Sequence, residues 1–306
     1  MPAITAEALR NGDFRTVARS ISIVENSKPG SDELLRSIQT KYVPVIGITG
    51  PPGAGKSTIV DALIKKFTHD EKKLAVLCVD PSSSFHSGAL LGDRIRMNRW
   101  FDNPRVFVRS FASRGAIGGL NSRIFQITDL LAFAGFDYIL IETVGVGQTE
   151  VEITKLADQV VLVLVPESGD DIQTMKSGIM EIGDIFVVNK SDRPGAEQFL
   201  LSLKSSIQFQ TAKSVDEISF IKTVATEEKG IAELYEAIRN IHRLKRGPSL
   251  QQLTHKAWQI ISEHRMRDVK MDSLMHSLEI AVREPDFNIY RFAESVSLQK
   301  SVDKFE

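Results

Sequence analysis

The sequence is poor in several residue types and patterns, and each shortage excludes a class of protein. It has one cysteine among 306 residues, so a disulfide within the chain is excluded. Positive and negative side chains nearly balance, at a formal net charge of −1, which argues against a nucleic-acid or anionic-membrane partner. No apolar run reaches the roughly eighteen residues of a membrane-spanning helix, and no secretory signal follows Met1. We therefore expect a cytoplasmic protein.

Metal-ligating side chains are also scarce. Cys78 lies in the apolar run 74–79 and is interpreted as a small core residue. The carboxy-terminal histidines His255, His264 and His276 lack a fixed metal-ligand spacing and are interpreted as structural. The sequence therefore gives no indication of a transition-metal centre.

A glycine-rich loop is the most informative stretch. The run GPPGAGKS at 50–57 follows an apolar segment, 43–49, and leads into a helical pattern, which is the context of the phosphate-binding loop GxxxxGK[ST]. In such a loop the backbone N–H groups surround a phosphate at a helix amino terminus. Lys56 would reach the β- and γ-phosphates, and the Ser57 hydroxyl would bind Mg²⁺. The candidate nucleotide-binding residues here are Gly50, Pro52, Gly53, Ala54, Gly55, Lys56, Ser57 and Thr58.

Two aspartates lie at the end of the next expected strand, 74–80, and beyond it. Asp80 ends that strand, and Asp93 lies in the glycine-containing segment beyond it. A carboxylate at the carboxyl end of a parallel strand beside a phosphate loop lies where Mg²⁺ and its waters bind. An aspartate before proline is also a common turn residue, so both interpretations of Asp80 stay open.

A second acid-and-glycine pattern begins at 138. The apolar run ends in Glu142, and Gly145 and Gln148 follow in a glycine loop. In phosphate-loop NTPases the acid orients Mg²⁺ or its water, and the glycine amide contacts the γ-phosphate. Gln148 is a candidate for positioning the attacking water, although it lies farther from the strand than the corresponding residue of small GTPases.

The tetrapeptide NKSD after the apolar run 185–188 indicates which base is bound. The Asp192 carboxylate can accept from both N1–H and the exocyclic amine of guanine, whereas adenine offers no such pair of donors. Lys190 would pack over the ring, and Asn189 would tie this loop to the phosphate loop. The backbone N–H of Ala225 is a candidate contact to the guanine oxygen. The pattern therefore favours GTP over ATP.

The order of these segments predicts an α/β fold, a phosphate-loop NTPase of the G-protein type with a mainly parallel sheet. We expect a helical amino-terminal preface (1–40), with a helix capped by Ser31, a GTPase domain (41–246) and a carboxy-terminal helical extension (247–306). The extension either covers the domain's own core or presents an apolar stripe to a second subunit.

The motifs together resemble one family. GPPGAGKST, VDPSSS, GALLGDRIRM, SRGAIGGL, ETVGVGQTE, PESGDDIQTMKSGIMEIGD and NKSD are similar to those of the MeaB/ArgK family, GTPase chaperones of adenosylcobalamin-dependent acyl-CoA mutases such as methylmalonyl-CoA mutase. The resemblance implies a homodimeric, Mg²⁺-dependent GTPase that gates cofactor loading. Adenosylcobalamin would belong to the mutase, and a cobalamin adenosyltransferase is a further candidate partner.

The resemblance also implies roles for single residues. Ser57, Asp80, Asp93 and Glu142 would form the Mg²⁺ environment. Lys176 would lie in a third switch segment that moves toward the phosphates when the mutase binds, so that Lys56, Glu142, Gln148 and Lys176 are the candidate catalytic residues.

Two other functions stay open at this stage. A nickel-insertion GTPase shares the phosphate loop, although such proteins usually carry histidine- or cysteine-rich segments. A kinase of transport systems would require a protein acceptor and a catalytic base for it, and the sequence shows neither.

Overall fold

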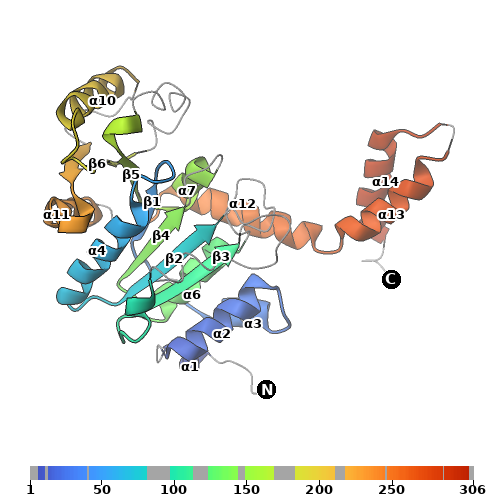
Figure 1. Cartoon of the computed structure of the whole chain (residues 1–306). Helices are drawn as coiled ribbons and strands as arrows, with labels where there is room; N and C mark the ends of the chain where they lie inside the picture. Colours follow the sequence, from blue (N-terminus) through green and yellow to red (C-terminus); the bar gives the residue numbers. More distant parts are fainter. Residues whose placement is uncertain are drawn as a thin grey trace. The chain divides into compact units, whose positions relative to one another are not determined.

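The computed structural model of this chain (Figure 1) divides into two compact units, Met1–Gln252 and Leu253–Glu306. The described residues are 6–10, 13–39, 41–80, 97–112, 123–143, 149–168, 183–210, 218–244, 247–284 and 286–302.

A parallel sheet is the centre of the first unit. Its seven described strands have the order β3-β2-β4-β1-β5-β6-β7, and every neighbouring pair is parallel. The predicted α/β fold with a mainly parallel sheet is therefore confirmed. The strands are β1 (Val45–Thr49), β2 (Leu74–Asp80), β3 (Val106–Ala112), β4 (Tyr138–Thr143), β5 (Gln159–Leu164), β6 (Ile185–Asn189) and β7 (Ser219–Thr223).

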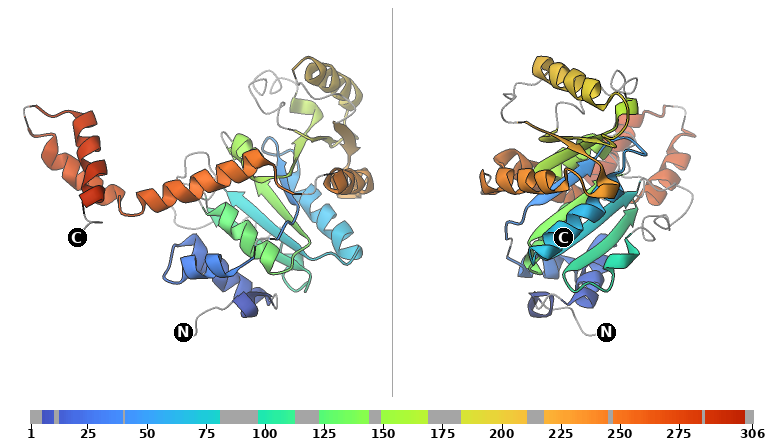
Figure 2. Two further views of the ribbon diagram at one scale, coloured as in Figure 1. Left: turned by 180° about the vertical axis from the view of Figure 1, so that it is seen from behind. Right: turned by 60° about the vertical axis from the view of Figure 1, so that its left-hand side comes forward.

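Helices cover both faces of this sheet. They are α1 (Ala6–Arg10), α2 (Phe14–Glu25), α3 (Ser31–Ser37), α4 (Lys56–His69), α6 (Ile124–Phe133), α7 (Thr149–Leu156), α10 (Ala196–Gln210) and α11 (Ile231–Leu244). Short 3₁₀ turns are η1 (Asn98–Trp100), η2 (Pro166–Ser168) and η4 (Ala225–Glu227). Helices α4 and α11 pack on one face, and α6, α7 and α10 on the other, as the two views in Figure 2 show for α4 and α6. Because both faces are covered, the central strands are mainly apolar, as the sequence pattern predicted, and their buried polar residues lie at the strand ends.

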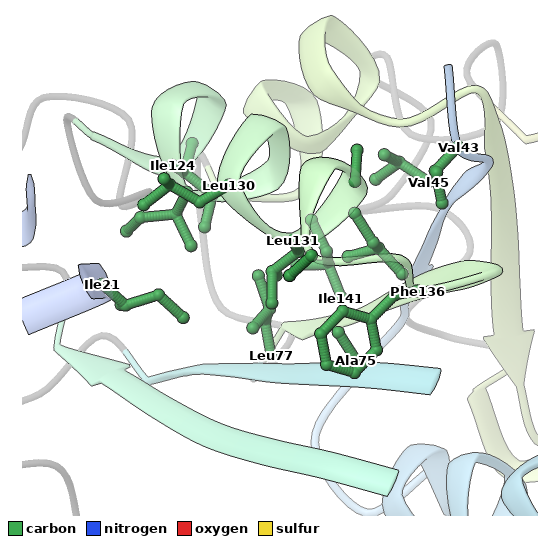
Figure 3. Close-up of a cluster of buried hydrophobic side chains, with 14 of the residues drawn as sticks. Ile21, Val43, Val45, Ala75, Leu77, Ile124, Leu130, Leu131, Phe136 and Ile141 are labelled. Atoms are coloured by element: carbon green, nitrogen blue, oxygen red, sulfur yellow. The ribbon is translucent and has the colours of Figure 1, made fainter. Parts of the chain in front are cut away.

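The amino-terminal helices share the core of this unit. Figure 3 shows Ile21 of α2 and Leu131 of α6 in the cluster that also contains Leu77 of β2. Polar contacts add to the packing, because the half-buried guanidinium of Arg109 on β3 pairs with Glu25 at 2.7 Å. Helix α2 is thus fastened to the sheet by apolar packing and by an ion pair.

The predicted cap of α3 is wrong. The structure places Gly30, not Ser31, at the N-cap, and Ser31 is the buried first residue of the helix. Gly30 has a φ of 88°, a conformation that glycine adopts without strain and serine does not. The left-handed turn before the helix therefore moves the cap one residue earlier.

The second unit contains the remainder of α12 (Leu250–Met266), α13 (Met271–Ala281) and α14 (Ile289–Val302). None of its described side chains is buried, and large apolar residues such as Trp258, Met271 and Tyr290 are exposed. No helix in the described part of the chain combines the length and apolar character required to cross a membrane.

Candidate nucleotide site

The phosphate loop joins the end of β1 to the start of α4. Its glycines Gly50, Gly53 and Gly55 have φ values of 139°, 77° and 90°. A Cβ atom on Gly50 would lie 2.0 Å from the carbonyl oxygen of Val163, and one on Gly55 would lie 2.4 Å from Nδ2 of Asn189. Two positions of the loop therefore need glycine for space as well as for conformation.

Lys56 lies inside this loop although it is charged. Its residue is buried, and Nζ donates hydrogen bonds to the carbonyl oxygens of Gly50 at 2.8 Å and Pro51 at 2.9 Å. A buried ammonium group needs such acceptors, because burial without them carries a large desolvation cost. The loop carbonyls thus hold a positive charge beside backbone N–H groups that begin a helix, an arrangement that suits a phosphate ligand.

Ser57 and Glu142 come together beside the loop. The Ser57 hydroxyl on α4 donates to Oε1 of Glu142 on β4 at 2.6 Å, and Glu142 is buried. Strand β4 is the neighbour of β1, which is why a residue 85 positions away reaches the loop. A hydroxyl and a carboxylate are oxygen ligands of the kind that Mg²⁺ binds beside substrate phosphates, so these two side chains fit that ion.

The remaining predicted metal ligands lie wholly or partly outside the described residues. The backbone of Asp80 ends β2 opposite Ala112 of β3, at the same edge of the sheet as Glu142, but its side chain is outside the description. Asp93, Gly145, Gln148 and Lys176 also lie outside the described residues. Within the described part of the chain, no group of three or more His, Cys, Asp or Glu side chains could hold a metal ion.

The Asn189 side chain connects three loops. Its Nδ2 donates to the carbonyl oxygen of Ala54 in the phosphate loop at 2.8 Å. Its Oδ1 accepts from Oγ1 of Thr223 at 3.0 Å and from the backbone N–H of Ala225 at 3.2 Å. Thr223 is a functional candidate that was not predicted from the sequence. Its position two residues before Ala225 could have indicated it.

The rest of the loop after β6 also faces the phosphate loop. Lys190 has a φ of 56°, and its Nζ donates to the carbonyl oxygen of Gly53 at 2.8 Å. Asp192 is exposed in the same turn, which the Ser191 N–H fixes by donating to the carbonyl oxygen of Thr223 at 3.0 Å. An exposed carboxylate on a fixed turn can accept hydrogen bonds from a base.

One ion pair links this turn to the loop after β5. Arg193 pairs with Glu167, and hydrogen bonding to Arg193 holds the pKa of the Glu167 carboxyl below its ordinary value. Both side chains are about half exposed, so solvent screens the pair and its contribution to stability is small.

A further contact fixes the flank of α4. Asp61, one turn after Ser57, accepts a hydrogen bond from Nε1 of Trp100 at 2.8 Å and also pairs with Arg99. No sequence motif marked Asp61, because its partners are 38 and 39 positions away.

The chain is similar in sequence to known proteins. The sequence model of the family described as methylmalonyl Co-A mutase-associated GTPase MeaB matches residues 17–281. A Pyrococcus abyssi protein named as a GTPase is 41% identical over 306 residues, covering 98% of this chain and 92% of that protein. The fused isobutyryl-CoA mutase of Geobacillus kaustophilus is 34% identical over 263 residues, covering 79% of this chain and 24% of that protein.

A solved structure shows the same fold. The crystal structure described as LAO/AO transport system kinase superposes with a TM-score of 0.66 at 24% identity, covering 95% of this chain and 96% of that one. At this identity the likeness concerns the fold alone.

The steric role of Gly55 can be separated from its backbone role. We expect Gly55→Ala to push Asn189 away from Ala54 and to weaken GDP binding roughly tenfold or more, because hydrogen bonds of about 1 kcal/mol each are lost together. The matched control is Gly53→Ala, since Gly53 lies in the same loop with a φ of 77° and nothing within 4 Å of an added Cβ. Titration with a fluorescent GDP analogue measures both variants. Equal binding by the two variants would contradict the steric argument.

Proposed function

Because the chain belongs to the family of the methylmalonyl Co-A mutase-associated GTPase MeaB, we propose that it hydrolyses GTP to GDP and phosphate in an Mg²⁺-dependent reaction. We further propose that this cycle gates the loading of adenosylcobalamin into an acyl-CoA mutase and protects or reactivates that enzyme. The observation that carries the nucleotide assignment is the Asn189 side chain, which binds the loop after β6 directly to the phosphate loop.

Each part of the site has a chemical task in this proposal. The loop N–H groups and Lys56 bind the phosphates, and Ser57 and Glu142 hold Mg²⁺ together with Asp80 and Asp93. The bound Mg²⁺ would neutralise charge on the β- and γ-phosphates. Phosphoryl transfer needs positioning and charge stabilisation more than covalent chemistry, so a site of this composition suffices for a slow resting rate.

Base selection rests on the loop after β6. Asp192 would accept from N1–H and the exocyclic amine of guanine, and the Ala225 N–H would contact the guanine oxygen. In this structure the Ala225 N–H donates a hydrogen bond to Oδ1 of Asn189. Binding of the base would therefore exchange this acceptor for the guanine oxygen. Lys190 is held over the loop by its bond to Gly53, which leaves its stem beside the proposed position of the base.

The mutase is proposed from a relative. A protein named fused isobutyryl-CoA mutase contains a segment similar to most of this chain, so a domain of this kind can share one polypeptide with a mutase. Lys176 is proposed to move toward the phosphates when the mutase binds, while Gly145 contacts the γ-phosphate and Gln148 positions the attacking water. Adenosylcobalamin is proposed to bind the mutase, and a cobalamin adenosyltransferase remains a candidate supplier.

A second copy of the chain is proposed to cover the carboxy-terminal helices. The second unit exposes Trp258, Ile261 and Met271, and none of its described side chains is buried. Exposed apolar residues concentrated on one small helical unit indicate an interaction surface. A homodimer would give these helices the core that they lack as a single copy.

Guanine specificity is tested by exchanging the Asp192 carboxylate for an amide. We expect Asp192→Asn to weaken GDP binding roughly 10- to 100-fold, since the hydrogen bond from the exocyclic amine is lost and the one from N1–H no longer has a charged acceptor. The amide can instead donate to the 2-oxygen of xanthine, so binding of xanthosine diphosphate should rise. Asp102→Asn, at another exposed aspartate, is the control and should bind as the wild type does. Unchanged preference in Asp192→Asn would remove this residue from base selection.

The partner is tested by turnover measurements. Wild-type protein with Mg²⁺ should hydrolyse GTP slowly and ATP not at all. The rate should rise when a stoichiometric adenosylcobalamin-dependent acyl-CoA mutase from the same organism is added. In Lys176→Ala we expect that acceleration to be lost, because the charge proposed to stabilise the transition state is absent. If turnover is specific for GTP but no such mutase changes its rate, the GTPase proposal stands and the proposed partner is excluded.

The dimer is tested by light scattering after size-exclusion chromatography. Wild-type protein should have the mass of a dimer, and Trp258→Glu should shift it to a monomer, because a charge in an apolar interface is desolvated without a partner. Leu201→Glu is the control, since Leu201 is an exposed leucine of the first unit and lies outside the proposed interface. A monomeric wild type would contradict this proposal and leave the GTPase proposal intact.

A further inference from the structure

Two buried threonines meet at the ends of β1 and β4. Oγ1 of Thr143 donates a hydrogen bond to Oγ1 of Thr49 at 2.8 Å, and neither residue is accessible to solvent. The register between these strands runs to Ile48 opposite Glu142, so the two threonines form the next pair. The sequence motifs assigned no role to either residue.

The pair lies directly beneath the proposed metal site. Thr49 precedes Gly50 of the phosphate loop, and Thr143 follows Glu142. Successive side chains of a strand point to opposite faces, so Glu142 lies on the face that carries α4 and the threonines lie on the other face. The end of β4 is therefore held on one face to the end of β1 by the hydroxyl pair, and on the other face to the start of α4 by the bond between Glu142 and Ser57.

Burying two hydroxyl groups costs desolvation free energy, because each gives up its hydrogen bonds with water. Two valines would fill the same space without removing polar groups from water, and a buried hydrogen bond adds little net stability. What a hydrogen bond adds over an apolar contact is a fixed distance and direction. The contribution of the pair is therefore geometric: it fixes the spacing between the phosphate loop and Glu142.

We propose that Thr49 and Thr143 are positioning residues for the Mg²⁺ site, holding the Glu142 end of β4 at a fixed spacing from the phosphate loop. The inference rests on the proposed GTPase function. Outer residues that orient metal ligands contribute to metal affinity although they do not touch the ion. Loss of the hydroxyl pair should accordingly change the dependence on Mg²⁺ more than the affinity for the nucleotide itself.

The test compares Thr49→Val, Thr143→Val, the double valine variant and Thr143→Ser. The Mg²⁺ concentration that half-suppresses release of a fluorescent GDP analogue should rise about threefold to tenfold in both single valine variants, less than the roughly 10- to 100-fold typical of residues bonded to a metal ligand, because the threonines act through the strand ends. The midpoint of thermal unfolding without nucleotide should fall in these variants, because each leaves one buried hydroxyl unpaired. Thr143→Ser retains the hydroxyl, so its Mg²⁺ requirement and its unfolding midpoint should both match those of the wild type.

The double valine variant separates positioning from simple stability. It removes both hydroxyls, so its unfolding midpoint should return toward the wild-type value while its Mg²⁺ requirement stays raised. Recovery of both values together, or an unchanged Mg²⁺ requirement in all variants, would overturn the inference. Thr128→Val is the control, because Thr128 is a buried threonine of α6 that bonds within its own helix, to the carbonyl oxygen of Phe125 at 2.8 Å.

Failure of this inference is distinguishable from failure of the proposed function. A wild-type protein that does not bind the GDP analogue would overturn both. A wild type that binds it with Mg²⁺-dependent release, beside valine variants that behave identically, would overturn the positioning role alone.

Discussion

The hydrogen bonds of the Asn189 side chain are the constraint on which the rest of the site depends. One primary amide has two N–H donors and one carbonyl acceptor, and here it joins the ends of β6 and β7 to the phosphate loop. The residues that it connects are 34 to 135 positions away along the chain. A carboxylate of the same shape could not donate to Ala54. The position of this amide depends on Gly55, because a side chain there would occupy the space that the amide fills.

The strand order explains why these residues meet. After β1 the chain builds one side of the sheet through β2, β3 and β4, then returns to the other side of β1 with β5. The carboxyl end of β1 is therefore flanked by strands from both halves, and ligands of open parallel sheets bind at such a reversal. Glu142 reaches the phosphate loop from one side and Asn189 from the other. The site is a consequence of topology as much as of the loop motif.

The sequence predicted those parts of the protein that are encoded locally. The phosphate loop, the apolar strands and the acid at the end of β4 each have a short pattern whose physical reason is local. Ser31 shows the limit of such patterns, because a favourable cap residue was overruled by the left-handed turn at Gly30. Thr223 and the Thr49–Thr143 pair show a second limit. Their roles come from partners brought close by strand pairing, which a single sequence without its register does not reveal.

The polar groups of the site bond to one another in this structure. Lys56 binds two loop carbonyls, the Ser57 hydroxyl binds Glu142, and the Ala225 N–H binds Asn189. A nucleotide and its metal ion would have to exchange these bonds for new ones, so only the difference between the two sets would appear as affinity. In the proposed GTPase, such an exchange would limit how tightly either GTP or GDP can bind. For a protein proposed to act through a cycle of binding, hydrolysis and release, that limit is an advantage, because product bound too tightly would stop the cycle.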